Sequence, residues 1–459
     1  MLFYILFPIF YILVVWTKPK WALFLICALL PTYQLRFQIL GLPTTFLEIM
    51  ILILFIIWVI KFQKARILNS IFRILYSSHW FWLILAWLAV GLAAVFVSSD
   101  KWAALGHWRA YFLEPILLLI VFLDLAKRDR FSTPTSSTMS SASNTILFGL
   151  SISAIICSLW AIGQKIFGGG MSSLESWQYP LQPIWRSTGF FPHPSFLGLF
   201  LGPLTILFLG KSFEFFKSKK LLFASYPASS GTPPKAVAIF YFLVFVLSVF
   251  AIIFARSEGA ILGVGAGLIF LLLLYLKKRP RLIFVTILLL IGVFLLFFSP
   301  WQKTIWQKIT FQDLSLQMRL NIWRGAVDLI KDHPIFGAGL RGYQKLISQY
   351  QQPFSLPDVE GIISNELHPY PHNLFLAIWA ELGILGLIVF LSIIFKFFLD
   401  GFRKIKNQNI CHLSFVIWIL AAMVVILVHG AVDTPYFKND LSIIFWLMVG
   451  LIIIHRHQD

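Results

Sequence analysis

About thirteen strongly apolar stretches follow one another along this chain of 459 residues, and most are close to 20 residues long. A helix needs about 20 residues to cross the hydrocarbon core of a bilayer. The repetition of this length predicts an all-α integral membrane protein, a polytopic helix bundle of about 12–13 spans. The expected spans are 2–16, 21–35, 44–60, 79–97, 106–126, 146–167, 194–210, 236–255, 258–276, 282–299, 373–395, 412–430 and 440–455. The second is weak, because Pro31 and Gln34 interrupt it.

The composition supports this interpretation and excludes several classes of protein. Hydrophobic residues make up 59% of the chain and charged residues 12%, which no soluble fold of this length tolerates. The formal net charge of +18 would suggest a nucleic-acid-binding protein if the chain were soluble. In a membrane protein, the Lys and Arg side chains that hold cytoplasmic loops inside explain this charge, so we expect no nucleic acid partner.

Basic residues gather in alternate gaps between the predicted spans. The positive-inside rule places these gaps in the cytoplasm and predicts an outer N-terminus and an inner C-terminus. Residues 1–16 could pass for a signal peptide, but no small-residue cleavage site follows, so we interpret them as the first span. The basic gaps contain Lys18 and Lys20; Lys61, Lys64, Arg66 and Arg73; Lys127, Arg128 and Arg130; Lys211, Lys217, Lys219, Lys220 and Lys235; Lys277, Lys278, Arg279 and Arg281; Lys396, Arg403, Lys404 and Lys406; and Arg456.

One gap is much longer than the others and falls on the predicted outer side. It divides the single integral domain into an N-terminal bundle (1–299), an extracytoplasmic loop or lid (300–372) and C-terminal helices (373–459). A loop of this length between spans is usually functional. Inside it, apolar residues at helical spacing predict an amphipathic helix that carries Arg319 and Arg324. The apolar residues of this helix are Leu316, Leu320, Trp323, Val327 and Ile330.

The end of this loop contains two histidines, His368 and His372, and a strongly apolar predicted helix follows directly. His372 falls on the first turn, where the helix dipole disfavours imidazolium, and a neutral imidazole is what a general base needs. A helix-capping or interface histidine is the alternative interpretation. A metal site is disfavoured, because Pro369 and Pro371 prevent a regular helix between the histidines and no third ligand is obvious. Which of the two histidines acts as the base stays open.

Other polar residues fall on the same predicted side. Arg186 and His193 lie in the segment that leads into the seventh span, and Arg256 lies in a tight turn between two apolar spans. Arginine offers a planar fork of donors that suits phosphate oxygens. The alternatives are a snorkelling Arg186 and an internal Arg256–Glu258 pair. Asp433 could orient His372, pair with an arginine, or be an ordinary loop carboxylate.

Two features inside the spans have competing interpretations. Glu381 lies about 13 Å of helix below His372 (1.5 Å per residue). A buried carboxylate in a span suggests function, but it could also be a structural tie between helices. Gly263, Gly265 and Gly267 look like a nucleotide-binding loop only superficially. They sit inside a span, so we expect close helix packing there.

These residues together resemble a known family. The segment from His372 to Gly386 reads HNLFLAIWAELGILG, which is similar to the signature of the O-antigen ligase and O-antigen polymerase superfamily. The order of the other pieces also resembles that superfamily, and the resemblance covers most of the chain. Those pieces are Arg186-x-x-Gly189-x-x-x-His193-Pro, Arg256-Ser-x-Gly259, Arg319-x3-Trp323-x-x-Ala326 and Pro334-x-x-Gly337-x-Gly339.

The resemblance implies a GT-C-like membrane glycosyltransferase in a bacterial cytoplasmic (inner) membrane. Such enzymes take a glycan from an undecaprenyl-diphosphate carrier at the periplasmic or extracellular side, and an inverting transfer is expected. Arginines matching Arg256 and Arg319 are taken to hold the diphosphate, and the histidine matching His372 to act on the acceptor hydroxyl. Those three are the expected catalytic residues. The expected substrate-binding residues are Arg186, His193, Arg324, His368, Asn373 and Glu381.

Chemistry agrees with this implication, and two alternatives stay open. Arginines fixed near a diphosphate stabilise the charge that builds as the glycosidic bond breaks. The sequence contains no Asp-x-Asp pair, which favours a metal-independent enzyme without a cofactor. The expected acceptor is lipid A core or another glycan. The first alternative is a repeat-unit polymerase of the same superfamily. The second is a transporter of lipid-linked sugars, but the sequence shows no convincing internal repeat.

Overall fold

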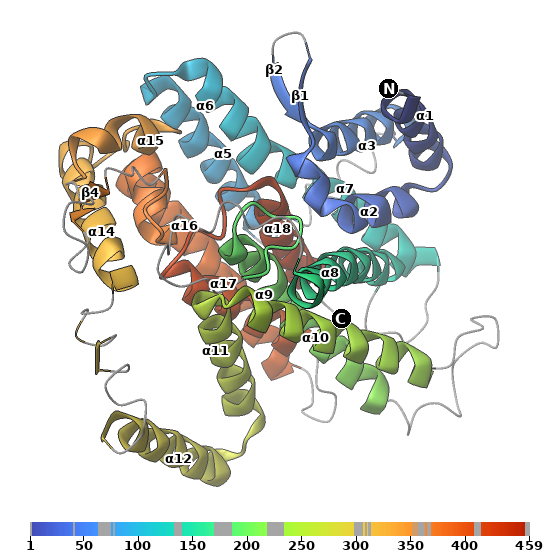
Figure 1. Ribbon diagram of the computed structural model, residues 1–459. Coiled ribbons are helices and arrows are strands. Elements are labelled where there is room, and N and C mark those ends of the chain that lie inside the picture. Colours follow the sequence, from blue (N-terminus) through green and yellow to red (C-terminus); the bar gives the residue numbers. More distant parts are fainter. Residues whose placement is uncertain are drawn as a thin grey trace.

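A computed structural model of the protein shows helices along nearly all of the part of the chain that it describes (Figure 1). The described residues are 2–39, 42–62, 79–132, 140–168, 186–217, 234–297, 314–351, 369–407 and 415–454, with short pieces at 75–76, 306–307, 310, 354–355 and 363–364. Each predicted span overlaps a helix. The long helices are α1 (Leu2–Thr17), α2 (Pro19–Ala28), α3 (Phe46–Phe62), α5 (Trp80–Val97), α7 (Glu114–Ser132), α8 (Ser141–Phe167), α9 (Pro194–Lys217), α10 (Pro234–Ala255), α11 (Glu258–Tyr275), α12 (Lys278–Phe297), α14 (Leu314–Asp332), α16 (Leu374–Asn407), α17 (Phe415–Gly430) and α18 (Asn439–Ile454).

Short elements connect these helices. Pro31 follows the end of α2 and the chain turns into a 3-10 helix, so the weak second span is shorter than predicted. A π-helical turn joins α6 to α7, and the two helices together replace the predicted fifth span. The short elements are η1 (Leu30–Gln34), α6 (Lys101–Trp108), η2 (Arg109–Leu113), α15 (Gly342–Leu346) and η5 (Ile347–Gln349), with the antiparallel hairpins β1 (Arg36–Ile39) with β2 (Leu42–Thr45) and β3 (Phe354–Ser355) with β4 (Ile363–Ser364).

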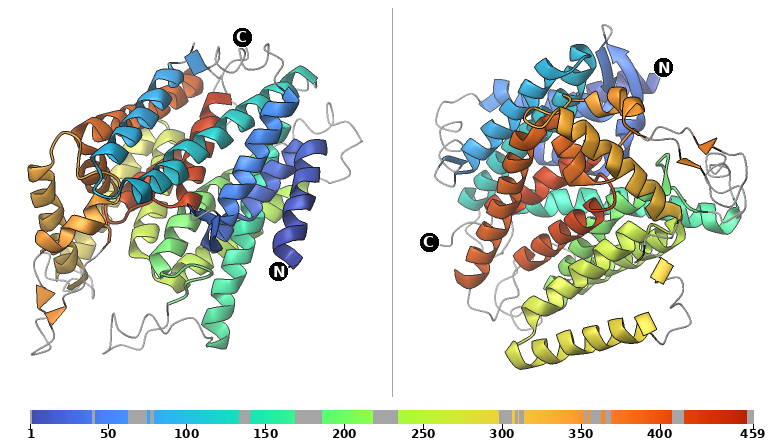
Figure 2. Two further views of the ribbon diagram at one scale, coloured as in Figure 1. Left: turned by 90° about the horizontal axis from the view of Figure 1, so that it is seen from above. Right: turned by 90° about the vertical axis from the view of Figure 1, so that its left-hand side faces the viewer.

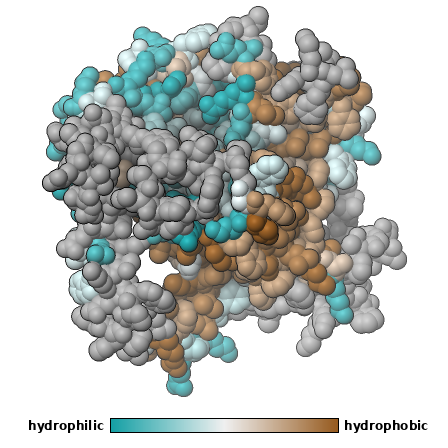
Figure 3. Space-filling view, in the orientation of Figure 1, coloured by the Kyte–Doolittle hydropathy of each residue, from teal (hydrophilic) through white to brown (hydrophobic). Residues whose placement is uncertain are grey.

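Six helices among the described residues are long and apolar enough to cross a membrane, and the protein is a multi-pass membrane protein. They are Trp80–Val97, Ser141–Phe167, Pro194–Glu214, Lys235–Ala255, Glu258–Tyr275 and Leu374–Lys406. Shorter apolar helices accompany them, α17 and α18 among these. Large apolar side chains stay exposed on the helix surfaces, and apolar surface spreads over the right and lower parts of the face in Figure 3. Such a surface suits lipid. The total of 12–13 spans stays a prediction.

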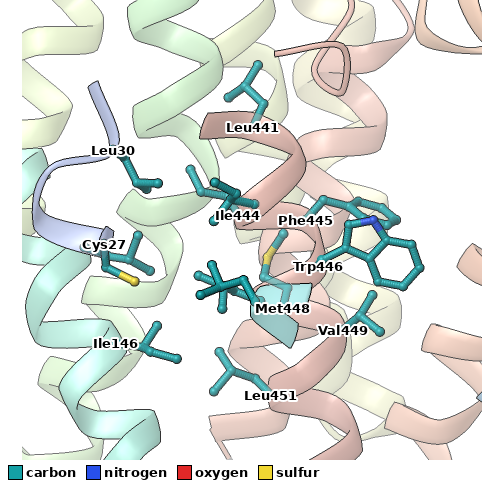
Figure 4. Close-up of a cluster of buried hydrophobic side chains, with 14 of the residues drawn as sticks. Cys27, Leu30, Ile146, Leu441, Ile444, Phe445, Trp446, Met448, Val449 and Leu451 are labelled. Atoms are coloured by element: carbon teal, nitrogen blue, oxygen red, sulfur yellow. The ribbon is translucent and has the colours of Figure 1, made fainter. Parts of the chain in front are cut away.

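The centre of the bundle is α18. Every residue of this helix is buried, which is expected of a helix that is apolar all round. Its side chains face Cys27, Leu30 and Ile146 of α8, which lie on the same side of α18 (Figure 4). The packing fixes the N-terminal end of α18 and therefore the loop that precedes it.

Helices α9, α10, α11 and α17 pack side by side in front of this centre. Gly263 and Gly267 lie on the seam between α11 and α17, where an added Cβ would come within about 3 Å of Val425 or the carbonyl of Ala421. Gly265 faces open space. The predicted close helix packing is confirmed for the first two glycines and is wrong for Gly265.

The predicted helix of the long loop exists as α14, and it lies against α16 (Figures 1 and 2). Its buried residues include Ala326, Leu329 and Ile330. Val327, which we expected on the apolar face, is 39% exposed. The helix ends at Asp332, and the turn that follows docks on α16.

A break in α16 receives that turn. Gly383 has φ 69° and ψ −173° inside the helix, and an added Cβ would collide with the carbonyl of Ile335. The Ala338 N–H donates to the Ala380 carbonyl at 2.7 Å, and the Ile384 N–H donates to the Pro334 carbonyl at 2.9 Å. Backbone-to-backbone contact of this kind requires glycine, and it fixes the loop to the first turns of α16.

Candidate functional site

The starts of α9, α11 and α16 and the end of α17 meet at one end of the bundle. We call this place the mouth, and it consists of residues 186–195, 255–259, 369–373 and 429–438. Backbone and side-chain hydrogen bonds hold its parts together. The Ser187 N–H donates to the Phe254 carbonyl at 3.0 Å, and the Asn373 side-chain amide donates to the Ala431 carbonyl at 3.0 Å.

His372 stands at the entrance to α16. Asn373 caps the helix, because its Oδ1 accepts the N–H groups of Phe375 and Leu376, each at 3.0 Å. His372 precedes this cap and has φ 44°. This backbone conformation is energetically unfavourable for a residue that has a Cβ atom, and such residues cluster at functional sites. Its side chain is 30% exposed, and its Nδ1 lies 3.4 Å from the Asp433 Oδ1.

Asp433 is the buried partner of this imidazole. Burial raises the pKa of the carboxyl, but the hydrogen bond from His372 and the nearby imidazoles outweigh burial and hold the pKa well below its usual range. The Thr434 N–H also donates to Oδ1 at 2.8 Å. An ionised Asp433 favours the tautomer of His372 with its proton on Nδ1, which leaves the Nε2 lone pair to accept a proton. Of the three interpretations of Asp433, the structure fits the one in which it orients His372.

His193 is the second imidazole of the mouth. Burial and the neighbouring Arg186 lower its pKa to about 4, so it is neutral at pH 7. Its Nδ1 accepts the Ser195 N–H at 3.1 Å, which leaves the proton on Nε2. His193 also interacts electrostatically with Asp433 and His372. A neutral imidazole that carries its proton on Nε2 can donate a hydrogen bond to an oxygen acceptor of a ligand.

Arg186 ties the loop before α9 to the turn before α11. Its Nε donates to the Ala255 carbonyl at 3.0 Å, and its Nη2 donates to the Arg256 carbonyl at 3.2 Å. Arg256 itself has φ 48° and an exposed side chain. Arg186 therefore fixes the unusual backbone from which the Arg256 guanidinium projects.

Arg319, on α14, acts on this group electrostatically. It is close enough to His429 to interact electrostatically, and so is Asp433. His429 is only 2% exposed, and its Nδ1 has no hydrogen-bond partner among the described residues. An added Cβ on Gly259 would lie 2.5 Å from this ring, so glycine lets α11 and the imidazole approach. Electrostatic interactions thus link Arg319 and Asp433 to His429, and Asp433 contacts His372 directly.

Two members of the mouth, His429 and Lys438, were not predicted from the sequence. The spacing of four residues between His429 and Asp433 was the available signal for the histidine. Lys438 lies over the Phe196 ring. Burial lowers the pKa of this amine well below its usual value, although Asp440 and Asp433 act in the opposite direction.

Other predicted site residues lie elsewhere. Glu381 is buried and accepts a hydrogen bond from the backbone N–H of Arg341, with Tyr370 nearby. Arg324 is exposed, and it projects about 140° around α14 from Arg319 at 3.6 residues per turn. Asn373 is a cap, as described above. His368 lies outside the described residues.

Neither Arg256 nor Arg319 takes part in an ion pair among the described residues, in contrast to several cations elsewhere in the protein. The Arg256–Glu258 pair, the alternative interpretation of Arg256, is not among the ion pairs of the described residues. No group of three or more His, Cys, Asp or Glu side chains in the described ranges is arranged to hold a metal ion. The metal-independent chemistry expected above stays a prediction.

Comparison with known proteins adds an independent line of information. The family model described as O-antigen ligase matches residues 243–391, which include α11, α14 and the first half of α16. A Rickettsia conorii protein named "putative polysaccharide ligase" is 29% identical over 201 residues, which cover 42% of this chain and 45% of that protein. A Rickettsia prowazekii protein with the same description is 30% identical over 174 residues, or 37% of this chain and 41% of that protein. The chain thus matches less than half the length of these relatives.

Proposed function

Because the chain belongs to the O-antigen ligase family through residues 243–391, we propose that it is a membrane glycosyltransferase that moves a glycan from an undecaprenyl-diphosphate carrier to an acceptor hydroxyl. The observation that carries this proposal is the His372–Asp433 pair among the arginines of the mouth. The pair supplies a base, and the arginines supply charge for a leaving diphosphate. The mouth opens at the outer face of a bacterial cytoplasmic membrane in this proposal.

His372 accepts the proton of the acceptor hydroxyl on Nε2. Asp433 holds the ring in the required tautomer and stabilises the imidazolium that forms. A positioned base of this kind typically contributes about 10²–10⁴-fold to a rate. The 30% exposure of the His372 side chain leaves room for an acceptor to approach.

Arg256 and Arg319 bind the diphosphate. As the bond between the anomeric carbon and the phosphate oxygen breaks, its electron pair moves onto the diphosphate, and the guanidinium groups stabilise that charge. The acceptor oxygen forms the new glycosidic bond on the opposite side of the sugar, so the configuration inverts. His193, with its Nε2–H, donates a further hydrogen bond to an oxygen of the donor. No metal ion is required for these steps.

The parts of the chain divide this work. Residues 1–299 and 373–459 form the membrane bundle, and the extracytoplasmic loop of residues 300–372 brings Arg319 to the mouth. The contact of Gly337 with the break at Gly383 fixes α14 relative to His372. We include in the proposal a GT-C-like arrangement in which this loop covers the bound head group.

Transfer by the purified protein tests the proposal. The protein, in lipid nanodiscs with EDTA, is given an undecaprenyl-diphosphate-linked glycan and either lipid A core or a second glycan as acceptor. We expect one acceptor to gain the mass of the glycan. A gain on lipid A core identifies a ligase, and a gain on the second glycan identifies a polymerase. No gain on either acceptor, or activity that requires a divalent ion, would contradict the proposal as stated.

A further inference from the structure

A second polar site lies at the end of the bundle away from the mouth. Helix α7 starts near the mouth, since the Tyr436 hydroxyl donates to the Tyr111 carbonyl just before it. The 19 residues of α7 then run about 28 Å, at 1.5 Å per residue, to the other end. A cavity of about 580 Å³ opens there between α2, α7 and α8. Its position on the basic side of the predicted topology makes it cytoplasmic.

Cations line one side of this cavity. Lys18, Lys20 and Arg128 all contribute to its wall, and their side chains are partly or fully exposed. Lys18 takes part in no ion pair among the described residues. The first turns of α2 and α8 also border the cavity, so their dipoles add positive potential.

Two of these cations form ion pairs with buried carboxylates. Asp129 pairs with Lys20 and also accepts the Ala142 N–H at 2.8 Å. Asp124 pairs with Arg128 at 2.6 Å and accepts the Trp58 indole N–H at 2.8 Å. Both carboxylates are buried, and each accepts a hydrogen bond from an N–H group of the protein in addition to its ion pair. The cations are thereby fixed in place, while three positive groups against two carboxylates leave the cavity with a positive charge.

The other side of the cavity is aromatic. Phe24 stacks with Phe148 at a ring distance of 5.4 Å, and Trp21 meets Phe24 edge-on at 5.4 Å. Trp21 is 53% exposed and Phe148 is 40% exposed. In a membrane protein these rings face lipid, and tryptophan is favoured at the level of the head groups. A ligand at this place meets cations at one end and an apolar track at the other.

We propose that this cavity binds an anionic phospholipid, with the phosphate between Lys18, Lys20 and Arg128 and an acyl chain along Trp21, Phe24 and Phe148. Basic pockets between helices on the cytoplasmic side recognise lipid head groups by this combination. A free phosphate ion would use the cations alone and leave the aromatic side without a role. The site is separate from the mouth, and the proposal does not depend on the proposed function.

Native mass spectrometry of the purified protein tests the site. The protein is released from bilayers that contain equal amounts of phosphatidylglycerol and phosphatidylcholine, and the bound lipids are counted. We expect the wild type to retain phosphatidylglycerol preferentially, and Lys18→Gln/Lys20→Gln to lose this preference by roughly tenfold or more. A matched control, Lys277→Gln/Arg281→Gln, removes two charges on the same predicted side outside the cavity and should keep the preference.

A second variant guards against a folding defect in the first. Thr145→Trp fills the cavity and leaves every ion pair in place, so it should also abolish retention without changing the melting temperature. Inorganic phosphate at millimolar concentration should not displace the lipid. Equal retention by wild type, Lys18→Gln/Lys20→Gln and Thr145→Trp would overturn the proposal. Complete displacement by inorganic phosphate would also overturn it and would indicate an anion site only.

Discussion

The two ends of the bundle hold similar cations in different surroundings. At the cavity between α2, α7 and α8, Lys20 and Arg128 are paired with buried carboxylates of the protein itself. At the mouth, the buried carboxylate Asp433 faces an imidazole. Arg256 and Arg319 take part in no ion pair among the described residues. The difference teaches that a buried carboxylate behind a cation fixes the place at which the cation meets a ligand, while a cation without an internal counter-charge offers its full charge to a ligand.

The largest effect should come from removing the base of the mouth. We expect His372→Ala to lower the rate of glycan transfer by about 10²–10⁴-fold, because in the proposed mechanism this imidazole takes the proton from the acceptor. Insertion and melting temperature should stay as in the wild type. His333→Ala, which removes an imidazole after α14, is the control and should stay active. A His372→Ala protein with wild-type transfer would refute the assigned role.

Within one helix, two arginines offer a direct comparison. Arg319→Ala should lose about 3 kcal/mol of transition-state stabilisation, a value typical of one lost donor to a developing anion. Arg324→Ala should change the rate by less than about 3-fold, because its side chain projects away from Arg319. The measurement is kcat/KM for the lipid-linked donor. Equal losses in the two variants would show that the direction of the side chain does not matter.

The break in α16 should be sensitive to a single methyl group. Gly383→Ala combines an unfavourable φ of 69° with a collision against Ile335, and we expect a loss of stability of about 3 kcal/mol or more. Gly265→Ala is the matched control, because the space around Gly265 is open. Thermal unfolding in detergent measures both. An unchanged melting temperature for Gly383→Ala would contradict the described docking of the loop.

His193 predicts a smaller, pH-dependent effect. Its folded-state pKa of about 4 lies below the ordinary value of 6.5. The contribution of the neutral His193 to the free energy of unfolding is therefore complete above pH 6.5. It falls as the pH drops toward 4, because the unfolded chain binds the proton first. The loss should reach at most about 3 kcal/mol. His193→Asn keeps an acceptor for the Ser195 N–H and should show a smaller fall in melting temperature between pH 7.5 and 4.5. Parallel curves for both proteins would argue against this protonation.

Much of the fold could be predicted from the sequence because bilayer thickness sets the length of an apolar helix. Every predicted span overlaps a helix, and the amphipathic α14 was also expected. The errors have physical reasons. Proline ended the second span early, and the spacing rule put Val327 on the buried face, whereas the buried face follows the contacts of α14 with α15 and α16.

The site was harder to predict, because residues far apart in the sequence meet there. The sequence indicated Arg186, His193 and His372 individually, and Asp433 only as one of three interpretations. His429 lay inside an apolar helix, where a single histidine is weak evidence. The role of Arg186 in fixing the Arg256 backbone depends on two carbonyl oxygens, and no sequence pattern reveals such a contact.

A double-mutant cycle on Arg256 and Arg319 tests the central claim most directly. If both guanidinium groups hold one diphosphate, the losses in kcat/KM for Arg256→Ala and Arg319→Ala should not add in the double variant, with an interaction energy above about 1 kcal/mol. Losses that add to within about 0.5 kcal/mol would show two independent arginines. That result would contradict a shared site at the mouth.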